Sequence, residues 1–81
     1  MELIDTIELM NSSDYKDRFK AEYLQTKIRY DKLDKLIVKA EAGTLDFKLN
    51  CEVELLKAQK NAMCLYLHLL EVRAEVEQIE L

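Results

Sequence analysis

The sequence predicts an all-α fold, an antiparallel hairpin of two long helices preceded by a short N-terminal helix. The 81 residues include no Pro and a single Gly, so little interrupts helical structure along most of the chain. Apolar residues recur at alternating steps of three and four, which is the period of a helix and not of a strand. Hydrophobic residues make up 49% and charged residues 35%, as expected for one folded domain over residues 1–81.

Residues 2–11 are predicted to form the short N-terminal helix. Its apolar residues repeat at helical spacing, but a helix of this length is marginal in water by itself. We therefore expect it to dock on a larger element. A polar break follows, in which Ser13 or Asp14 is the expected N-cap of the next helix.

The two long helices are predicted at about 14–42 and 52–80. Gly43 stands where the first periodic stretch stops, and we expect it to end that helix in a left-handed conformation. Asn50 or Cys51 is the expected N-cap of the second helix. The connection is too short for a crossover, so the helices must be antiparallel. Its apolar residues are expected to fold back over the open end of the hairpin; they are Leu45, Phe47 and Leu49.

Each long helix carries an apolar seam. That of the first helix contains Phe19, Tyr23, Thr26, Tyr30, Leu33, Ile37 and Ala40. That of the second contains Leu55, Ala58, Ala62, Leu65, Leu69, Val72, Val76 and Ile79, and we expect it to face the first helix. A second row runs beside it: Leu56, Gln59, Met63, Tyr66, Leu70 and Arg73. This row is too apolar to remain in water, so we expect the hairpins to assemble as a homo-oligomer.

Charge and cysteine usage exclude several function classes. The net charge is −4, and residues outside 14–42 are strongly acidic, which disfavours duplex nucleic acid as a partner. A small anion held by a few basic groups is compatible with this balance. Cys51 and Cys64 form no CxxC pair, which indicates free thiols in a reducing cytosolic setting, with Cys64 packed as a small hydrophobe. No membrane-spanning run is found.

Catalytic and metal-binding patterns are also missing from the sequence. The single histidine, His68, has no set of Cys, Asp or Glu at ligand spacing, so no metal site or cofactor is predicted. No nucleophile–base pair, Gly-rich phosphate loop or paired-carboxylate motif can be identified. We expect a protein that is not an enzyme.

The basic, amide and aromatic residues beside the seams are the candidate ligand-binding residues. Assembled hairpins would line a cavity with them, and Arg or Lys would hold phosphate while Tyr stacks on a base. The alternative is a solvent-exposed face with ion pairs such as Arg18–Glu22. The candidates are Arg18, Glu22, Tyr23, Arg29, Tyr30, Lys32, Gln59, Met63, Tyr66 and Arg73.

Much of the chain resembles a family of small helical proteins encoded by bacteriophages, including crAss-like phages. The stretches that carry the resemblance are 14–23, 27–33, 41–47, 55–59, Met63, 66–67 and 71–75. The pattern is also similar to the helical hairpin of phage sponges that sequester the cyclic nucleotide or cyclic ADP-ribose signals of CBASS and Thoeris immunity. The Gly-Tyr-Arg and Asn-x-x-Lys elements of those sponges are not present here, so their ligand contacts are not assigned to individual residues.

The resemblance implies a homo-oligomer that sequesters such a signal without cleaving it, in the cytoplasm of an infected bacterium. The alternative is a protein-interaction module, a phage inhibitor or adaptor that lays its second long helix against a host protein. A purely structural coiled coil is disfavoured by Gln59 and Arg73, which interrupt the second row.

Overall fold

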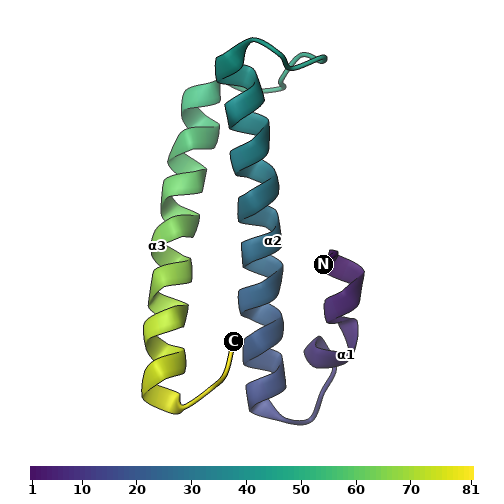
Figure 1. Cartoon of the computed structure of the whole chain (residues 1–81), viewed down its shortest axis with the longest axis vertical. Helices are drawn as coiled ribbons and strands as arrows, with labels where there is room; N and C mark the ends of the chain where they lie inside the picture. Colours follow the sequence, from purple (N-terminus) through teal and green to yellow (C-terminus); the bar gives the residue numbers. More distant parts are fainter.

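The computed structural model describes residues 1–81, and all its regular secondary structure is helical. A 3₁₀ turn, Leu3–Thr6, leads into the short helix α1 (Ile7–Met10), which is followed by α2 (Tyr15–Ala42) and α3 (Val53–Glu77). Helices α2 and α3 lie side by side and antiparallel, joined by the loop 43–52, with α1 on the far side of α2 (Figure 1). The predicted all-α hairpin is confirmed.

The ends of α2 follow from two residues. The Asp14 side chain accepts a hydrogen bond from the backbone N–H of Lys16 at 2.9 Å, which satisfies an otherwise free donor of the first turn. Gly43 has φ 76°, and its N–H donates to the carbonyl oxygens of Lys39 and Ala40. A residue without Cβ takes this left-handed conformation at little cost. Both expectations are confirmed.

Helix α3 begins later and ends earlier than the sequence suggested. Its N-cap is Glu52, not Asn50 or Cys51, and no side chain caps the first turn. At the other end Gln78 has φ 58° and leaves the helix, and the N–H of Ile79 donates to the Ala74 carbonyl at 2.8 Å. Ile79 therefore lies outside the helix, in contrast to its predicted place in the seam.

Burial of Ile79 explains this ending. The residue folds back and is buried in a cluster with Phe19, Leu70 and Ala74. Contact between the residue after a left-handed cap and the last turn is usual for this helix ending. The apolar contact offsets the strain of about 1–2 kcal/mol that a non-glycine residue incurs in the left-handed region.

The seam of α2 is inward, as predicted. Phe19 and Ile37 are buried, and the remaining seam residues are half-buried against α3. Ala21 is also buried, on the side of α2 that carries the N-terminal segment.

The assignment of faces on α3 was wrong. The residues that pack inward are Leu67, Leu70 and Ala74, with Met63 half-buried beside them. The predicted seam faces away: Leu65 is 61% and Val76 77% exposed, whereas Leu70 is 1% exposed. We call this outward row the outer stripe; it consists of Leu55, Ala58, Ala62, Leu65, Leu69, Val72 and Val76.

The polar neighbours of the inner row explain the rotation of α3. Glu71 accepts a hydrogen bond from Tyr23, and Lys60 forms an ion pair with Asp34 about three turns away on the same edge of the contact with α2. On the other edge Arg73 donates a hydrogen bond to Tyr15. Turning the outer stripe inward would break these pairs. Both rows have the same period, so spacing alone does not distinguish them.

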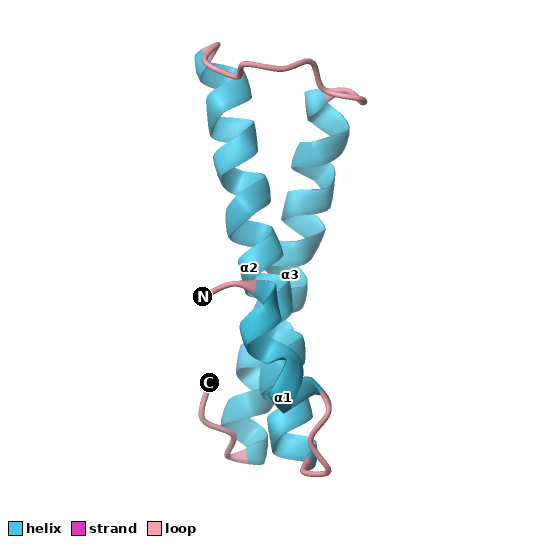
Figure 2. Ribbon diagram, turned by 90° about the vertical axis from the view of Figure 1, so that its right-hand side faces the viewer, coloured by secondary structure: helices cyan, strands magenta, loops and turns pink.

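The N-terminal segment packs on the face of α2 opposite α3, as expected for a helix too short to stand alone. Thr6 is fully buried; its hydroxyl donates to the Leu3 carbonyl at 2.7 Å and accepts from the Gln25 amide at 2.8 Å. Lys32 forms an ion pair with Glu2 at 3.2 Å. Figure 2 shows this segment lying over the half of the hairpin that is farther from the connecting loop.

We predict that Leu70→Ala lowers the free energy of unfolding by about 2–4 kcal/mol, because it opens a cavity between the two helices. The matched control is Leu65→Ala on the outer stripe, which should change stability by less than about 0.5 kcal/mol. Urea unfolding should be followed at protein concentrations low enough that the midpoint no longer depends on concentration. Equal losses in the two variants would mean that the face assignment is incorrect.

Candidate functional site

The structure gives two of the predicted ligand residues on α2 a local structural role. The Arg18 guanidinium donates to the Ser12 carbonyl at 2.8 Å, and it makes no ion pair with Glu22. Lys32 reaches Glu2. Both side chains thereby hold the N-terminal segment and the turn before α2 in place.

Tyr23 and Tyr30 lie between the two long helices. The Tyr23 hydroxyl donates to Glu71 at 2.8 Å, and burial together with this bond raises the pKa of Tyr23 to about 12. Desolvation between the helices and the neighbouring Cys64 thiol raise the pKa of Tyr30 as well. Cys64 lies at the outer edge of the contact between α2 and α3 and is exposed. The prediction that it packs as a small hydrophobe is therefore wrong.

Arg73 connects the two long helices at the open end of the hairpin, where α2 begins and α3 ends. Its guanidinium donates to the Tyr15 hydroxyl at 2.9 Å and to Glu77 at 3.2 Å, and it lies 5.0 Å from the centre of the Phe19 ring. These contacts are a cation–π interaction and charge-assisted hydrogen bonds, which stabilise the arrangement of the chain itself.

The remaining candidates follow one side of the hairpin without enclosing a cavity. Glu22, Arg29, Gln59 and Tyr66 are exposed, and helical spacing places them on the side where Tyr15 meets Arg73. Met63 is half-buried, with the Gln59 amide 4.0 Å from its sulfur. Within one chain, these residues form a row and not a pocket.

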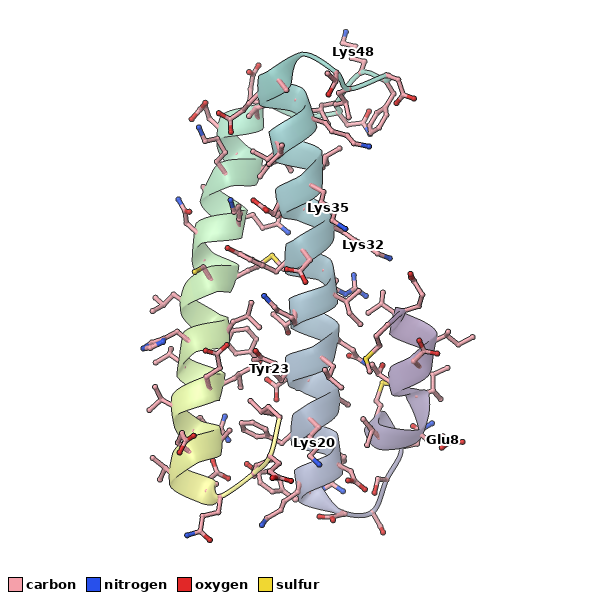
Figure 3. All side chains as sticks on the ribbon, viewed as in Figure 1. Glu8, Lys20, Tyr23, Lys32, Lys35 and Lys48 are labelled. Carbon is pink, nitrogen blue, oxygen red and sulfur yellow. The ribbon has the colours of Figure 1, made fainter.

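A basic cavity lies instead where α2 meets the connecting loop. Its volume is about 330 Å³, within the range of small-molecule sites. Figure 3 shows Lys32 and Lys35 projecting together from α2, on the side away from α3. We call this cavity the lysine pocket; it is lined by Lys32, Lys35, Leu36, Lys39, Thr44, Leu45, Asp46 and Phe47.

Helix geometry explains why three lysines meet there. Positions 32, 35 and 39 are separated by three and four residues, so their side chains emerge from one face of α2. Gly43 then turns the chain back and brings Thr44 and Phe47 over that face. The Phe47 ring is 58% exposed and forms an apolar wall beside the cations.

The pocket has an excess of positive charge. Lys35 and Lys39 form no ion pair, and Lys32 shares its charge with the exposed carboxylate of Glu2. Asp46 is the only acidic residue in the lining. Ammonium groups, a hydroxyl and an aromatic ring around one cavity are suited to a phosphorylated ligand that carries a ring.

Sequence reasoning included Lys32 but missed Lys35, Lys39, Thr44 and Phe47. The spacing of the three lysines was visible in the sequence. The position of Phe47 was not, because the path of the loop after Gly43 depends on contacts made in the folded chain.

Two other cavities are chemically less suited to an anion. The larger one, about 580 Å³, lies under the loop and is mainly apolar, with Lys48 and Glu52 as its charged residues. The other, about 240 Å³, lies beside Tyr30 and includes the Glu71 carboxylate. No three His, Cys, Asp or Glu side chains come together as a metal site. Neither long helix has the uninterrupted apolar length that crossing a bilayer requires.

Residues 13–76 match the family model described as Sequestin. This chain belongs to the Sequestin family. The matched region contains α2, the loop and nearly all of α3, and hence the whole lysine pocket, but not the N-terminal segment. No curated protein and no solved structure matches the chain. The name Sequestin points to a non-catalytic protein that sequesters a ligand.

We predict a loss of stability at high pH that depends on Tyr23. Its pKa is about 12 in the folded chain against 10.0 ordinarily, so the protonated hydroxyl contributes stability that is complete below pH 10 and is lost as the pH rises through 12. Tyr23→Phe should cost about 1 kcal/mol at pH 7. Between pH 10 and 12 its stability should fall less than that of the parent chain.

The measurement is urea unfolding at a series of pH values. Tyr66→Phe is the control, because Tyr66 is exposed and its hydroxyl has no hydrogen-bond partner within the chain. If Tyr23→Phe and the parent protein lose stability in parallel above pH 10, the pKa of Tyr23 is not raised in the folded chain.

Proposed function

We propose that this Sequestin-family protein binds a nucleotide-type immune signal in the lysine pocket and sequesters it without cleaving it. One observation carries the proposal: three lysines and an exposed aromatic residue line the same cavity. They are Lys32, Lys35, Lys39 and Phe47, and of the lysines only Lys32 forms an ion pair.

The chemistry of the lining supports a small anion over a nucleic acid duplex. The protein has a net charge of −4, so its overall field repels an extended polyanion. Three ammonium groups around one cavity attract a compact phosphate locally, where they lie within a Debye length of the ligand. Phe47 offers a face on which a base can stack.

Membership of the Sequestin family supports a protein that holds its ligand over an enzyme that converts it. Sequestering a signal requires only binding that is tight relative to the signal concentration, and the lysine pocket supplies groups that bind. The ligand in this proposal is a cyclic oligonucleotide or a cyclic ADP-ribose-type molecule. The protein is then a phage anti-defence protein that acts in the cytoplasm of the infected bacterium.

The proposal includes self-association. The outer stripe of α3 exposes large apolar side chains along most of the helix, and exposed surface of this kind marks an interaction site in soluble proteins. A homo-oligomer would cover it and would place several ligand sites in one particle.

Thermal unfolding with candidate ligands tests the proposal. Purified protein is mixed with cyclic dinucleotides, cyclic trinucleotides and cyclic ADP-ribose isomers, and a true ligand at 100 times its Kd should stabilise the fold by about 2.7 kcal/mol. The bound ligand should be recovered chemically intact after the protein is denatured. Cleavage of the ligand, or no stabilisation by any of these molecules, would contradict the proposal.

Charge reversal locates the site. Lys35→Glu with Lys39→Glu should weaken binding at least about tenfold, because each substitution replaces an attraction for phosphate by a repulsion. Lys20→Glu on the same helix is the matched control outside the pocket and should bind normally. A different result would contradict this location. If the double variant of Arg29→Ala and Tyr66→Ala loses binding and the double lysine variant does not, the site lies instead on the exposed row that contains Arg29 and Tyr66.

A further inference from the structure

The outer stripe is a continuous apolar surface that nothing in the single chain covers. It extends for about 32 Å along α3, at 1.5 Å per residue from Leu55 to Val76. Its positions alternate steps of three and four, the spacing of a helix that packs its full length against another helix. A partner helix with the same spacing is therefore the expected complement.

We propose that the outer stripe packs against the outer stripe of a second copy of this chain, with the two α3 helices antiparallel and related by a two-fold axis near Leu65. The inference rests on the self-association proposed above and specifies its geometry. In such a pair each position meets a position of the partner at a similar distance on the other side of the axis, as in other isologous interfaces.

Side-chain volume favours this orientation. The small residues of the stripe, Ala58 and Ala62, lie toward the start of α3, and the bulkier Leu69, Val72 and Val76 lie toward its end. Parallel helices would set Ala against Ala and bulk against bulk, which leaves a gap at one end. Antiparallel helices set small residues against large ones and allow close packing along the whole stripe.

Charge favours the same orientation independently. Lys57 and Glu75 are 18 residues apart, which is five helical turns, so they flank the same edge of the stripe. Their midpoint is at Tyr66, next to the proposed axis, so Lys57 of one copy lies opposite the partner's Glu75, and the reverse. Parallel pairing would place this edge of the two copies on opposite sides of the interface, so Lys57 would not meet the partner's Glu75. The contact of Lys57 with Glu41 is long, at 3.8 Å, and leaves the ammonium free to turn toward a partner.

The opposite edge of the stripe carries three of the predicted ligand residues. Tyr66 lies next to the axis, and Gln59 and Arg73 lie at nearly equal distances on either side of it. The antiparallel pair therefore sets Gln59 opposite the partner's Arg73, and the two Tyr66 rings side by side. The row predicted from sequence then belongs to the rim of the interface between copies.

Site-specific crosslinking tests the orientation. In the chain with Cys51→Ser and Cys64→Ser, Leu65→Cys should be joined to its partner by a short bis-maleimide. Val76→Cys should not, because the two copies of that position lie about 30 Å apart in an antiparallel pair. Both positions are exposed in the single chain, and circular dichroism verifies that each variant keeps its helices.

The outcomes separate the two proposals. Crosslinking at both positions would show a parallel pair and would overturn the orientation while leaving self-association intact. Crosslinking at neither position, with a monomer in analytical ultracentrifugation at micromolar concentration, would overturn self-association itself. The stripe would then be available to a different protein. Ligand stabilisation is measured separately, so its presence or absence does not bear on the interface.

Charge exchange provides an independent test. Glu75→Lys should weaken self-association about tenfold, since two symmetry-related attractions become repulsions. Adding Lys57→Glu to the same chain should restore it. Lys48→Glu in the loop is the control and should leave association unchanged. Failure of the second substitution to restore association would overturn the proposed register.

Discussion

The central constraint on this protein is that a pair of helices can bury only one face of each. Eight of the 81 residues are buried, and the main core cluster is Phe19, Leu70, Ala74 and Ile79. This is a small core for independent stability. The additional elements serve to enlarge it: the C-terminal residues fold back to bury Ile79, and the N-terminal segment covers Ala21 and buries Thr6 on the other side of α2.

Polar contacts at the edges of the helix pair determine which faces meet. Tyr23 with Glu71, Lys60 with Asp34, and the group formed by Tyr15, Arg73 and Glu77 follow the contact between α2 and α3 from the loop to the open end. Each is partly exposed and individually weak. Together they distinguish two apolar rows of equal period, because only one rotation of α3 satisfies all of them.

The contacts that hold the fold together also determine which charged side chains are available to a ligand. Side chains that a sequence marks as candidates for ligand binding, such as Arg18 and Arg73, are engaged in holding the chain together. Two of the cations left without an ion pair, Lys35 and Lys39, are found elsewhere, where the end of α2 and the loop form a cavity. A lysine is available to a ligand only where no acidic group of the fold lies within reach, and this depends on the whole structure.

The sequence by itself determined the helical class, the antiparallel order, the Asp14 and Gly43 ends of α2 and the inward seam of α2, because these follow from local spacing, capping and backbone preference. It also gave a resemblance to signal-sequestering proteins, which agrees with the Sequestin family match. Only the tertiary structure decided which face of α3 points inward, where α3 ends, and that Phe47 joins three lysines. These features depend on contacts between residues far apart in the chain, and helical periodicity contains no information about the rotation of one helix relative to another.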